Sequence, residues 1–184
     1  MKKREITIVG VLLVVYSTLV YPQGSQPPKP GPEHKKLAVF LGSWSVEGEY
    51  KVGNGYGAPA GKTTQVERWQ WLPGEFFIQM NREGKGPAGD FRHTIIWGYD
   101  ARSNKYTVAV FNLTAGASST GTITNTGNTW MISSNGHGPD GRPFQERCTL
   151  TIVPNASYTV KCETSTDGKN WSPSWEEKAT KLKL

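Results

Sequence analysis

The spacing of apolar residues changes once along the chain, at Gly42. Between residues 33 and 41 the apolar side chains recur at helical spacing, which predicts a short helix. From Trp44 onward, apolar and polar residues alternate, as they do in a half-buried strand. A glycine and a tryptophan therefore mark the point where a helix gives way to a long strand.

About ten alternating segments follow this point. They lie near residues 43–53, 61–71, 75–83, 91–100, 104–113, 117–125, 128–135, 143–153, 157–165 and 173–181. Turn signals such as Leu72-Pro73-Gly74-Glu75 separate them, and the connections are too short for helical crossovers. An open meander would expose its edge strands. The pattern thus predicts an all-β fold, an antiparallel up-and-down barrel of eight to ten strands, with a β-sandwich as the alternative.

The N-terminal region differs in composition from the rest. Residues 1–21 combine a basic start with the apolar run Ile6–Val20, which predicts a signal peptide; an uncleaved membrane anchor is the alternative, because the cleavage site is poor. Residues 22–32 are a proline-rich linker, and residues 33–184 form the barrel domain. We therefore expect an exported protein, periplasmic or secreted.

Charge and motifs narrow the function classes. The net charge is +6, but Lys and Arg form no stripe, so we predict no nucleic-acid partner and no membrane contact beyond the N-terminal segment. The sequence has no nucleophile elbow, zinc-protease motif or phosphate loop. Three widely spaced histidines do not predict a metal site. We therefore assign no catalytic residue, metal or cofactor.

Three short motifs carry a family resemblance. They are Pro32-Glu33-His34-Lys35-Lys36-Leu37, Gly42-Ser43-Trp44, and Gly98-Tyr99-Asp100 followed by Tyr106. With them, residues 32–181 resemble an exported bacterial family of unknown function with a calycin-like barrel, and more distantly lipocalin, fatty-acid-binding and nitrobindin-like barrels. The resemblance implies that the glycine of the second motif turns the chain into the barrel and that its tryptophan plugs the closed end. It implies no reaction.

The chain departs from these relatives at two places. The family often ends on Tyr-Thr-Arg, whereas this chain has Ala179-Thr180-Lys181, which puts in doubt a closing contact through a bidentate Arg. Nitrobindin-like barrels bind haem through a histidine near the C-terminal strand. No histidine follows His137 here, so haem binding of that kind is disfavoured.

Residues that face each other across a hairpin point to the same side of the sheet, so turn positions predict shared faces. The first predicted pairs are Tyr99 with Tyr106, Trp97 with Val108, Ile95 with Val110, and His93 with Asn112. At the Pro73-Gly74 turn they are Trp71 with Phe76, Trp69 with Ile78, and Glu67 with Met80. Around Asn155 they are Ile152 with Tyr158, Leu150 with Val160, Cys148 with Cys162, and Glu146 with Thr164.

Each of these apolar faces is interrupted by a few polar residues. In a closed barrel the inward faces share one interior, and a mostly apolar cavity with sparse polar groups is typical of a small-ligand site. The predicted ligand-binding residues are His93, Asn112, Glu67, Glu146, Trp97, Tyr99 and Trp69. The alternative is structural, with polar groups at the barrel rim and aromatic rings packed in the core.

The two cysteines lie symmetrically about Asn155. This register places Cys148 directly opposite Cys162, at a separation that a disulfide can span. An exported protein meets an oxidising compartment. We therefore predict a disulfide, with two reduced thiols as the alternative.

Three functions remain open. The leading prediction is a barrel that binds a small, largely apolar ligand. The second is a small enzyme that uses His93 with Glu67 or Glu146 for proton transfer. The third is a structural or interaction domain of the cell envelope, with a barrel filled by its own side chains. The volume and lining of the barrel interior would separate them.

Overall fold

The computed structural model describes residues 28–54, 57–138, 141–153 and 156–183. The predicted signal peptide, residues 1–21, lies outside the described residues. Within the described part of the chain, no helix has the length and apolar character needed to cross a membrane.

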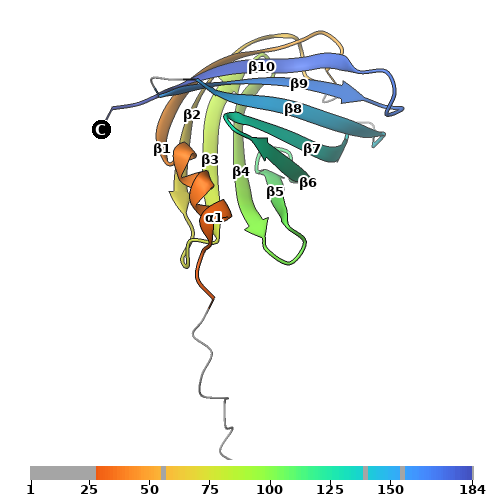
Figure 1. Cartoon of the computed structure of the whole chain (residues 1–184). Coiled ribbons are helices and arrows are strands. Elements are labelled where there is room, and N and C mark those ends of the chain that lie inside the picture. The colour runs from red at the N-terminus through yellow and green to blue at the C-terminus, as the bar shows by residue number, and fades with distance from the viewer. Residues whose placement is uncertain (1–27, 55–56, 139–140, 154–155, 184) are drawn as a thin grey trace, which may run out of the picture.

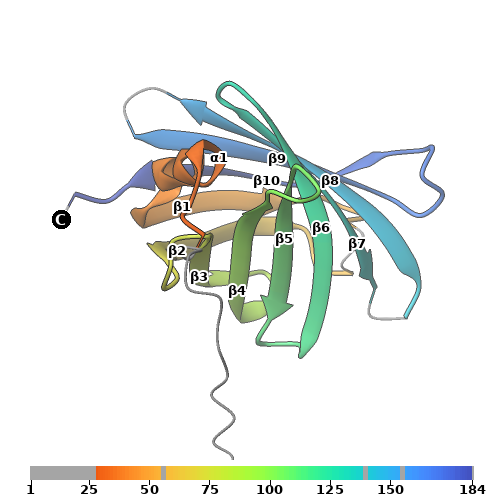
Figure 2. The ribbon, with the colours of Figure 1, turned by 60° about the horizontal axis from the view of Figure 1, so that its bottom comes forward.

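The ten predicted strands are present and close into one antiparallel barrel (Figures 1 and 2). The elements are α1 (Pro32–Lys36), a 3-10 turn (Leu37–Phe40), β1 (Gly42–Tyr50), β2 (Gly61–Trp71), β3 (Phe77–Gly86), β4 (Gly89–Asp100), β5 (Lys105–Asn112), β6 (Ala117–Thr126), β7 (Thr129–His137), β8 (Pro143–Val153), β9 (Ser157–Ser165) and β10 (Ser172–Lys181). Each strand pairs with its neighbours in sequence, and β1 pairs with β10 to close the ring. The all-β barrel prediction is confirmed, and the sandwich alternative is wrong.

The segment predicted as one short helix is an α-helix only in its first part, and its second part is a 3-10 helix. After α1 the chain continues as a 3-10 turn that ends at Phe40. This turn directs the Phe40 ring into the barrel, where it packs against Trp69, Trp97, Trp130 and Tyr158. These rings come from four different strands, so Phe40 closes one end of the barrel.

The first family motif fastens α1 to the barrel. His34 Nδ1 accepts a hydrogen bond of 3.1 Å from the Gly31 N–H, and the His34 ring makes edge contacts with Phe76 and Tyr99. The Tyr106 hydroxyl donates to the Glu33 carboxylate at 2.7 Å. The motif therefore anchors the helix and does not reach the far half of the barrel interior.

Gly42 and Trp44 lie at the start of β1, which follows the 3-10 turn. Gly42 has a φ of +111°, a conformation that side chains disfavour. Trp44 is 2% exposed, and its Nε1 donates to the Phe40 carbonyl at 2.7 Å. The Lys181 Nζ lies 5.2 Å from the centre of the Trp44 ring, in a cation–π interaction near the end of β10.

The Gly98-Tyr99-Asp100 motif shapes the β4–β5 hairpin. A side chain at Gly98 would place its Cβ 2.1 Å from the Phe77 ring, so the close approach requires glycine. The Asp100 carboxylate accepts hydrogen bonds from the Arg102 N–H and the Ser103 hydroxyl, which holds the turn. Both residues support the fold.

Two of the three predicted hairpin registers are confirmed. Strands β4 and β5 pair His93 with Asn112, and β8 and β9 pair Glu146 with Thr164, as the turns predicted. The β2–β3 register is shifted by two residues, so Glu67 lies opposite Arg82 and not Met80.

The cause of this shift lies in the turn itself. The Glu75 N–H donates to the Leu72 carbonyl at 3.0 Å, and Gly74 has a φ of +90°, as a type II turn requires. Glu75 then takes a φ of +58°, and the hairpin closes with the Leu72 N–H donating to the Phe77 carbonyl. The connection is longer than predicted. A shift of two residues keeps the same side chains inside.

Cys148 and Cys162 face each other across β8 and β9 and are joined by a disulfide, with Cα atoms 4.1 Å apart. The bond ties two neighbouring strands of the barrel wall.

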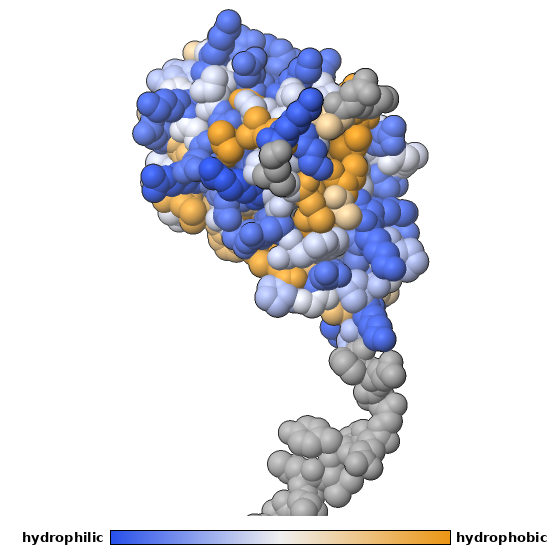
Figure 3. All heavy atoms as spheres, turned by 90° about the vertical axis from the view of Figure 1, so that its left-hand side faces the viewer, coloured by the Kyte–Doolittle hydropathy of each residue, from blue (hydrophilic) through white to orange (hydrophobic). Residues whose placement is uncertain are grey.

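The outer surface follows the alternation along the strands. The face on the side of β1 and the C-terminus is mostly hydrophilic, with apolar residues gathered in patches (Figure 3).

Candidate functional site

A cavity of about 430 Å³ occupies the barrel interior. The aromatic side chains Trp69, Trp97 and Tyr158, which pack against Phe40, line one end of it. The cavity extends to the loop residues Ala88 and Ala115, between β3 and β4 and between β5 and β6. The interior is therefore closed by rings at the α1 end and hollow beyond them.

The walls of the cavity are mainly apolar. They include Met80, Phe91, Ile95, Val108, Val110, Ile132, Phe144, Leu150 and Val160. These residues come from strands β3, β4, β5, β7, β8 and β9, because the inward face of each strand carries alternate residues. Polar residues make up a substantial minority of the lining, and burial shifts the pKa of His93 and Glu146 among them.

His93 lies on the cavity wall opposite Asn112. Among the described residues, His93 Nδ1 is buried and has no hydrogen-bond partner. Burial, together with the positive charge of Arg82, lowers the pKa of His93 to about 4, so the ring is neutral at physiological pH. The Asn112 Oδ1 accepts from the Thr114 and Ala115 N–H groups and holds the β5–β6 turn.

Glu146 lies on β8 and also lines the cavity. Its carboxylate accepts from Trp175 Nε1 at 3.1 Å and from the Ser134 hydroxyl at 3.3 Å, and it forms no ion pair with any described residue. Burial raises the pKa of Glu146 to about 7. This carboxyl is therefore stabilised only by neutral donors.

A buried ionic network fills the wall formed by β1, β2, β3 and β10. Glu67 is fully buried, and one of its oxygens accepts from Arg82 Nε at 3.0 Å and from an Arg82 terminal nitrogen at 2.5 Å. Its other oxygen accepts from Trp69 Nε1 at 3.0 Å and from the Tyr158 hydroxyl. Every oxygen of this carboxylate is thus partnered.

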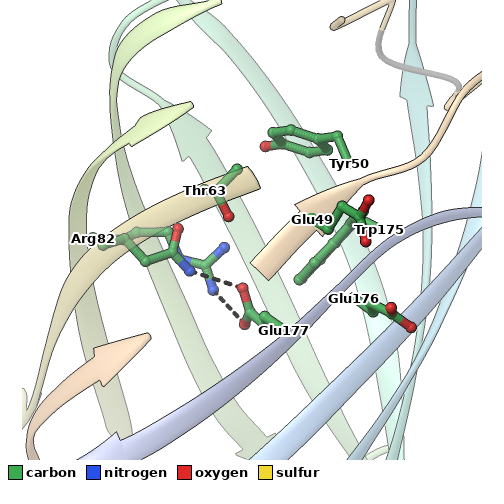
Figure 4. Close-up of a pocket in the computed structure, with 8 residues that line it drawn as sticks. Glu49, Tyr50, Thr63, Arg82, Trp175, Glu176 and Glu177 are labelled. Atoms are coloured by element: carbon green, nitrogen blue, oxygen red, sulfur yellow. Dashed lines mark hydrogen bonds and ion pairs between the residues drawn. The ribbon is translucent and has the colours of Figure 1, made fainter. Parts of the chain in front are cut away.

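Arg82 joins this network to a second acid. Its guanidinium reaches from β3 toward Glu177 on β10, at 3.0 Å (Figure 4). Gln65 donates to the other Glu177 oxygen at 2.8 Å. A small hollow of about 10 Å³ lies beside them, under Tyr50 and Thr63, with room for roughly one water.

The network changes the titration of its members. Burial lowers the pKa of the Arg82 guanidinium, but the adjacent Glu177 and Glu67 outweigh burial and raise it overall. Burial raises the pKa of Glu177 to about 7, against the opposing effect of Arg82. Arg82 therefore stays charged, and its positive charge is shared by two carboxyl groups.

Not all predicted ligand-binding residues reach the cavity. His93, Asn112, Glu146, Trp97 and Trp69 line it. Glu67 and Tyr99 are not among its lining residues.

Each of these two has a structural cause. Glu67 points inward as predicted, but Arg82 lies opposite it and engages its carboxylate. Tyr99 packs against His34 and Tyr106 at the α1 end of the barrel, on the far side of the aromatic rings that surround Phe40.

Three residues of the interior were missed, namely Arg82, Trp175 and Glu177, and Tyr158 was placed on the inner face but not among the ligand-binding residues. The correct β2–β3 register would have placed Arg82 beside Glu67. Trp175 and Glu177 lie on the last strand, and only closure of the barrel brings them to β1, β2 and β3.

One group of potential metal ligands lies beside the cavity. Glu146, Cys148 and Cys162 offer an oxygen and two sulfur atoms within 4.8 Å of one another. The two sulfurs are bonded to each other, and metal binding requires free thiolates. This group therefore does not form a metal site in the disulfide-bonded protein.

Comparison with known proteins gives a family and a fold. A family model described as a protein of unknown function (DUF1579) matches residues 29–181. No curated protein matches the chain. Among solved structures, Rv2717c from M. tuberculosis is 13% identical, with a TM-score of 0.62, and the match covers 83% of this chain and 99% of that one.

A second solved structure is similar over the same extent. The S-type phycobiliprotein lyase CPES from Guillardia theta is 10% identical, with a TM-score of 0.55, covering 83% of this chain and 93% of that chain. At these identities the likeness is one of fold.

Proposed function

The chain belongs to this family of unknown function, DUF1579, and we propose that its barrel binds a small, largely apolar molecule in the interior cavity. The observation that carries the proposal is the cavity of about 430 Å³, whose walls are mainly apolar with a minority of polar groups. Ligand sites in proteins commonly have a volume of about 300–1,000 Å³ and this kind of lining. A barrel that served only as a scaffold would gain stability by filling this space.

The polar groups support binding over simple packing. A buried nitrogen without a hydrogen-bond partner costs free energy, as at His93 Nδ1. A ligand group that hydrogen-bonds this nitrogen would remove the cost. The aromatic rings of Trp69 and Trp97 at the floor of the cavity offer flat surfaces for an apolar ligand body.

The proposal includes a place among calycin-like barrels and an exported setting, periplasmic or secreted. The short closing helix and the Gly42 and Trp44 roles support the first point. The Cys148–Cys162 disulfide supports the second, because such bonds persist in oxidising compartments.

The alternatives receive less support. An enzyme that used His93 with Glu67 would need a free carboxylate, but the oxygens of Glu67 are engaged by Arg82, Trp69 and Tyr158. A neutral His93 whose pKa is about 4 is a weak base near neutral pH. An envelope domain with a filled barrel does not account for the hollow interior.

A fluorescence titration with the uncharged, apolar dye N-phenylnaphthylamine tests the proposal. We expect one dye molecule to bind per barrel and to become fluorescent on burial. The variant Val110→Trp places a large ring in the cavity and should weaken binding at least about tenfold, or 1.4 kcal/mol.

The control is Phe111→Trp, on the same strand. Phe111 is 41% exposed on the outside of the barrel, so this variant should bind the dye as the unmodified protein does. Native mass spectrometry of the protein purified without denaturant should show the co-purified ligand. Equal dye binding by the two variants would overturn the proposed site.

A further inference from the structure

The charges that line the cavity do not balance. Arg82 is the sole permanent cation among the described lining residues, and it already pairs with Glu67 and Glu177. Glu146 and Asp90 add further carboxyl groups to the lining. The interior therefore has an excess of acidic groups.

Of the two acids Asp90 and Glu146, Asp90 is exposed to solvent, whereas Glu146 lies inside the barrel and has no cation partner among the described residues. Its two hydrogen bonds come from an indole and a hydroxyl, which are weaker partners for a carboxylate than a positive charge. Glu67 and Glu177, in the same barrel, both pair with Arg82. A buried carboxylate needs a partner of opposite charge to offset its desolvation.

The ring of Trp175 lies beside this carboxyl group. Its Nε1 bonds to Glu146, and the Arg82 Cζ lies 5.7 Å from the ring centre. The π face of this ring thus contacts the Arg82 guanidinium, while its N–H edge orients the Glu146 carboxylate. A carboxylate held only by neutral donors has its charge uncompensated and is suited to an ammonium or other nitrogen cation.

We propose that the cavity recognises its ligand by a positively charged nitrogen, bound by the Glu146 carboxylate beside the Trp175 ring. The ligand class is an amphipathic amine: an apolar body that fills the aliphatic and aromatic part of the cavity and one protonated nitrogen. This inference rests on the proposed function and adds the charge of the ligand to it. Anionic ligands are disfavoured, because Arg82 has no charge to spare.

The state of Glu146 gives the binding a pH dependence. The carboxyl must be ionised to pair with a cation, and burial raises its pKa to about 7. Binding of a cation should therefore release protons and weaken as the pH falls below 7. The other titratable or charged residues that line the cavity include Tyr50, Arg82, Asp90, His93, His137 and Glu177.

Among the titratable residues that line the cavity, Glu146 is the one whose effect on the pH dependence of binding we propose to test. His93 is neutral, with its pKa lowered to about 4, and burial raises the pKa of Tyr50 above its ordinary value of 10.0. Glu177 also titrates near 7 but pairs with Arg82. Substitution of Glu146 alone therefore separates its contribution from that of Glu177.

The test is isothermal titration calorimetry with three probes of one shape. Naphthylethylamine is cationic, naphthylethanol is neutral and naphthylacetate is anionic. At about pH 8 we expect the amine to bind at least about tenfold more tightly than the alcohol, and the acetate most weakly. Between about pH 8 and pH 6 the advantage of the amine should fall about tenfold, as Glu146 with a pKa of about 7 takes up a proton.

The variant Glu146→Gln retains acceptor and size but no charge. This variant should bind the amine and the alcohol with equal affinity at every pH tested. Its affinity for the alcohol should stay within about threefold of that of the unmodified protein. The matched control is Glu163→Gln, which removes a carboxylate paired with Arg147 on the outside of the barrel. It should keep the full preference for the amine.

The outcomes separate the two proposals. If the alcohol binds as well as the amine to the unmodified protein, the cavity binds ligands but the charge inference is wrong. If none of the three probes binds, both proposals are overturned. Should Glu146→Gln fail to fold, the probe preference and its pH dependence in the unmodified protein still decide the question.

Discussion

Two walls of the same barrel provide different partners for an inward-facing carboxyl group. On the β1–β2–β3–β10 wall, Glu67 has an arginine, an indole and a phenol as partners and is fully buried. On the β7–β8–β9 wall, Glu146 has an indole and a hydroxyl but no cation among the residues that the structure describes, and it lines the cavity. Both acids interrupt an apolar face in the sequence.

The difference separates structural acids from candidate ligand contacts. An acid whose oxygens are engaged within the protein offers nothing to a ligand, and its network fixes four strands relative to one another. An acid that lacks a cation remains available. Inward orientation is common to both, so burial alone does not identify a binding residue; the set of partners does.

The largest expected effect is on the Glu67 wall. The variant Arg82→Met keeps a long apolar stem but leaves Glu67 and Glu177 without their cation. We expect the free energy of unfolding to fall by about 3–5 kcal/mol, the usual cost of breaking a buried ion pair from one side. Urea denaturation measured by tryptophan fluorescence gives this value.

Arg68→Met is the matched control, because Arg68 pairs with Glu83 on the exposed side of the same hairpin. It should change stability far less, as exposed pairs contribute little. Equal losses in the two variants would mean that the buried network does not stabilise the barrel, and the contrast between the two walls would fail.

Sequence patterns predicted the positions of the strands more accurately than the partners in the buried network around Glu67. Alternation located all ten strands, and three of them, residues 61–71, 143–153 and 157–165, have the predicted bounds. Hairpin pairing also placed His93 and Glu146 on the inside, where the structure has them. These features depend on short stretches of chain, where periodicity and turn chemistry act directly.

The Glu67 network was missed because it depends on distant segments and on one turn. Glu75 adopts a left-handed conformation that its residue type does not signal, and this moved Arg82 opposite Glu67. Glu177 joins only because β10 closes against β1. An up-and-down barrel implies that the first and last strands meet, but no turn between them sets their register, so these partners had to come from the three-dimensional structure.

The family motifs belong to the closed end of the barrel. His34 and Gly98 fit α1 and the β4–β5 hairpin, and Trp44 bonds to the turn that carries Phe40. None of the three lines the cavity. These residues thus support the closed end, whereas Glu146 and Trp175, which would set ligand choice, lie on β8 and β10.

The second prediction concerns the disulfide on the Glu146 wall. The double variant Cys148→Ala/Cys162→Ala removes a cross-link between residues 14 apart, which stabilises by at most about 3 kcal/mol in the chain-entropy description. Unfolding by urea should show a loss up to this size. Reduction of the unmodified protein should give a similar loss.

The oxidation state of Cys148 and Cys162 is measured in a separate experiment. Intact mass after alkylation under denaturing conditions should show no modified cysteine in protein taken from its native compartment. Two alkylated cysteines would show that the bond is absent there. An unchanged unfolding curve in the double variant would mean that strand pairing alone holds this wall.

The smallest expected effect is the pH dependence that Glu146 adds to stability. Its pKa is about 7 in the folded protein and 4.5 for an ordinary Glu, so the folded state binds more protons between these values. Stability must therefore fall as the pH rises from about 4.5 through 7. Glu146→Gln removes this contribution, because the amide does not titrate, and retains an acceptor for Trp175.

The difference in unfolding free energy between Glu146→Gln and the unmodified protein is the quantity to measure. We expect this difference to shift in favour of the variant by about 1–2 kcal/mol between pH 5 and pH 8, less than the full pKa change would give, because Glu146 is only partly buried and solvent screens its charge. Glu163→Gln, outside the barrel, should show no such shift. Since Glu177 is present in all three proteins, its own titration cancels. A difference that stays constant with pH would show that Glu146 ionises without cost and needs no cation from a ligand.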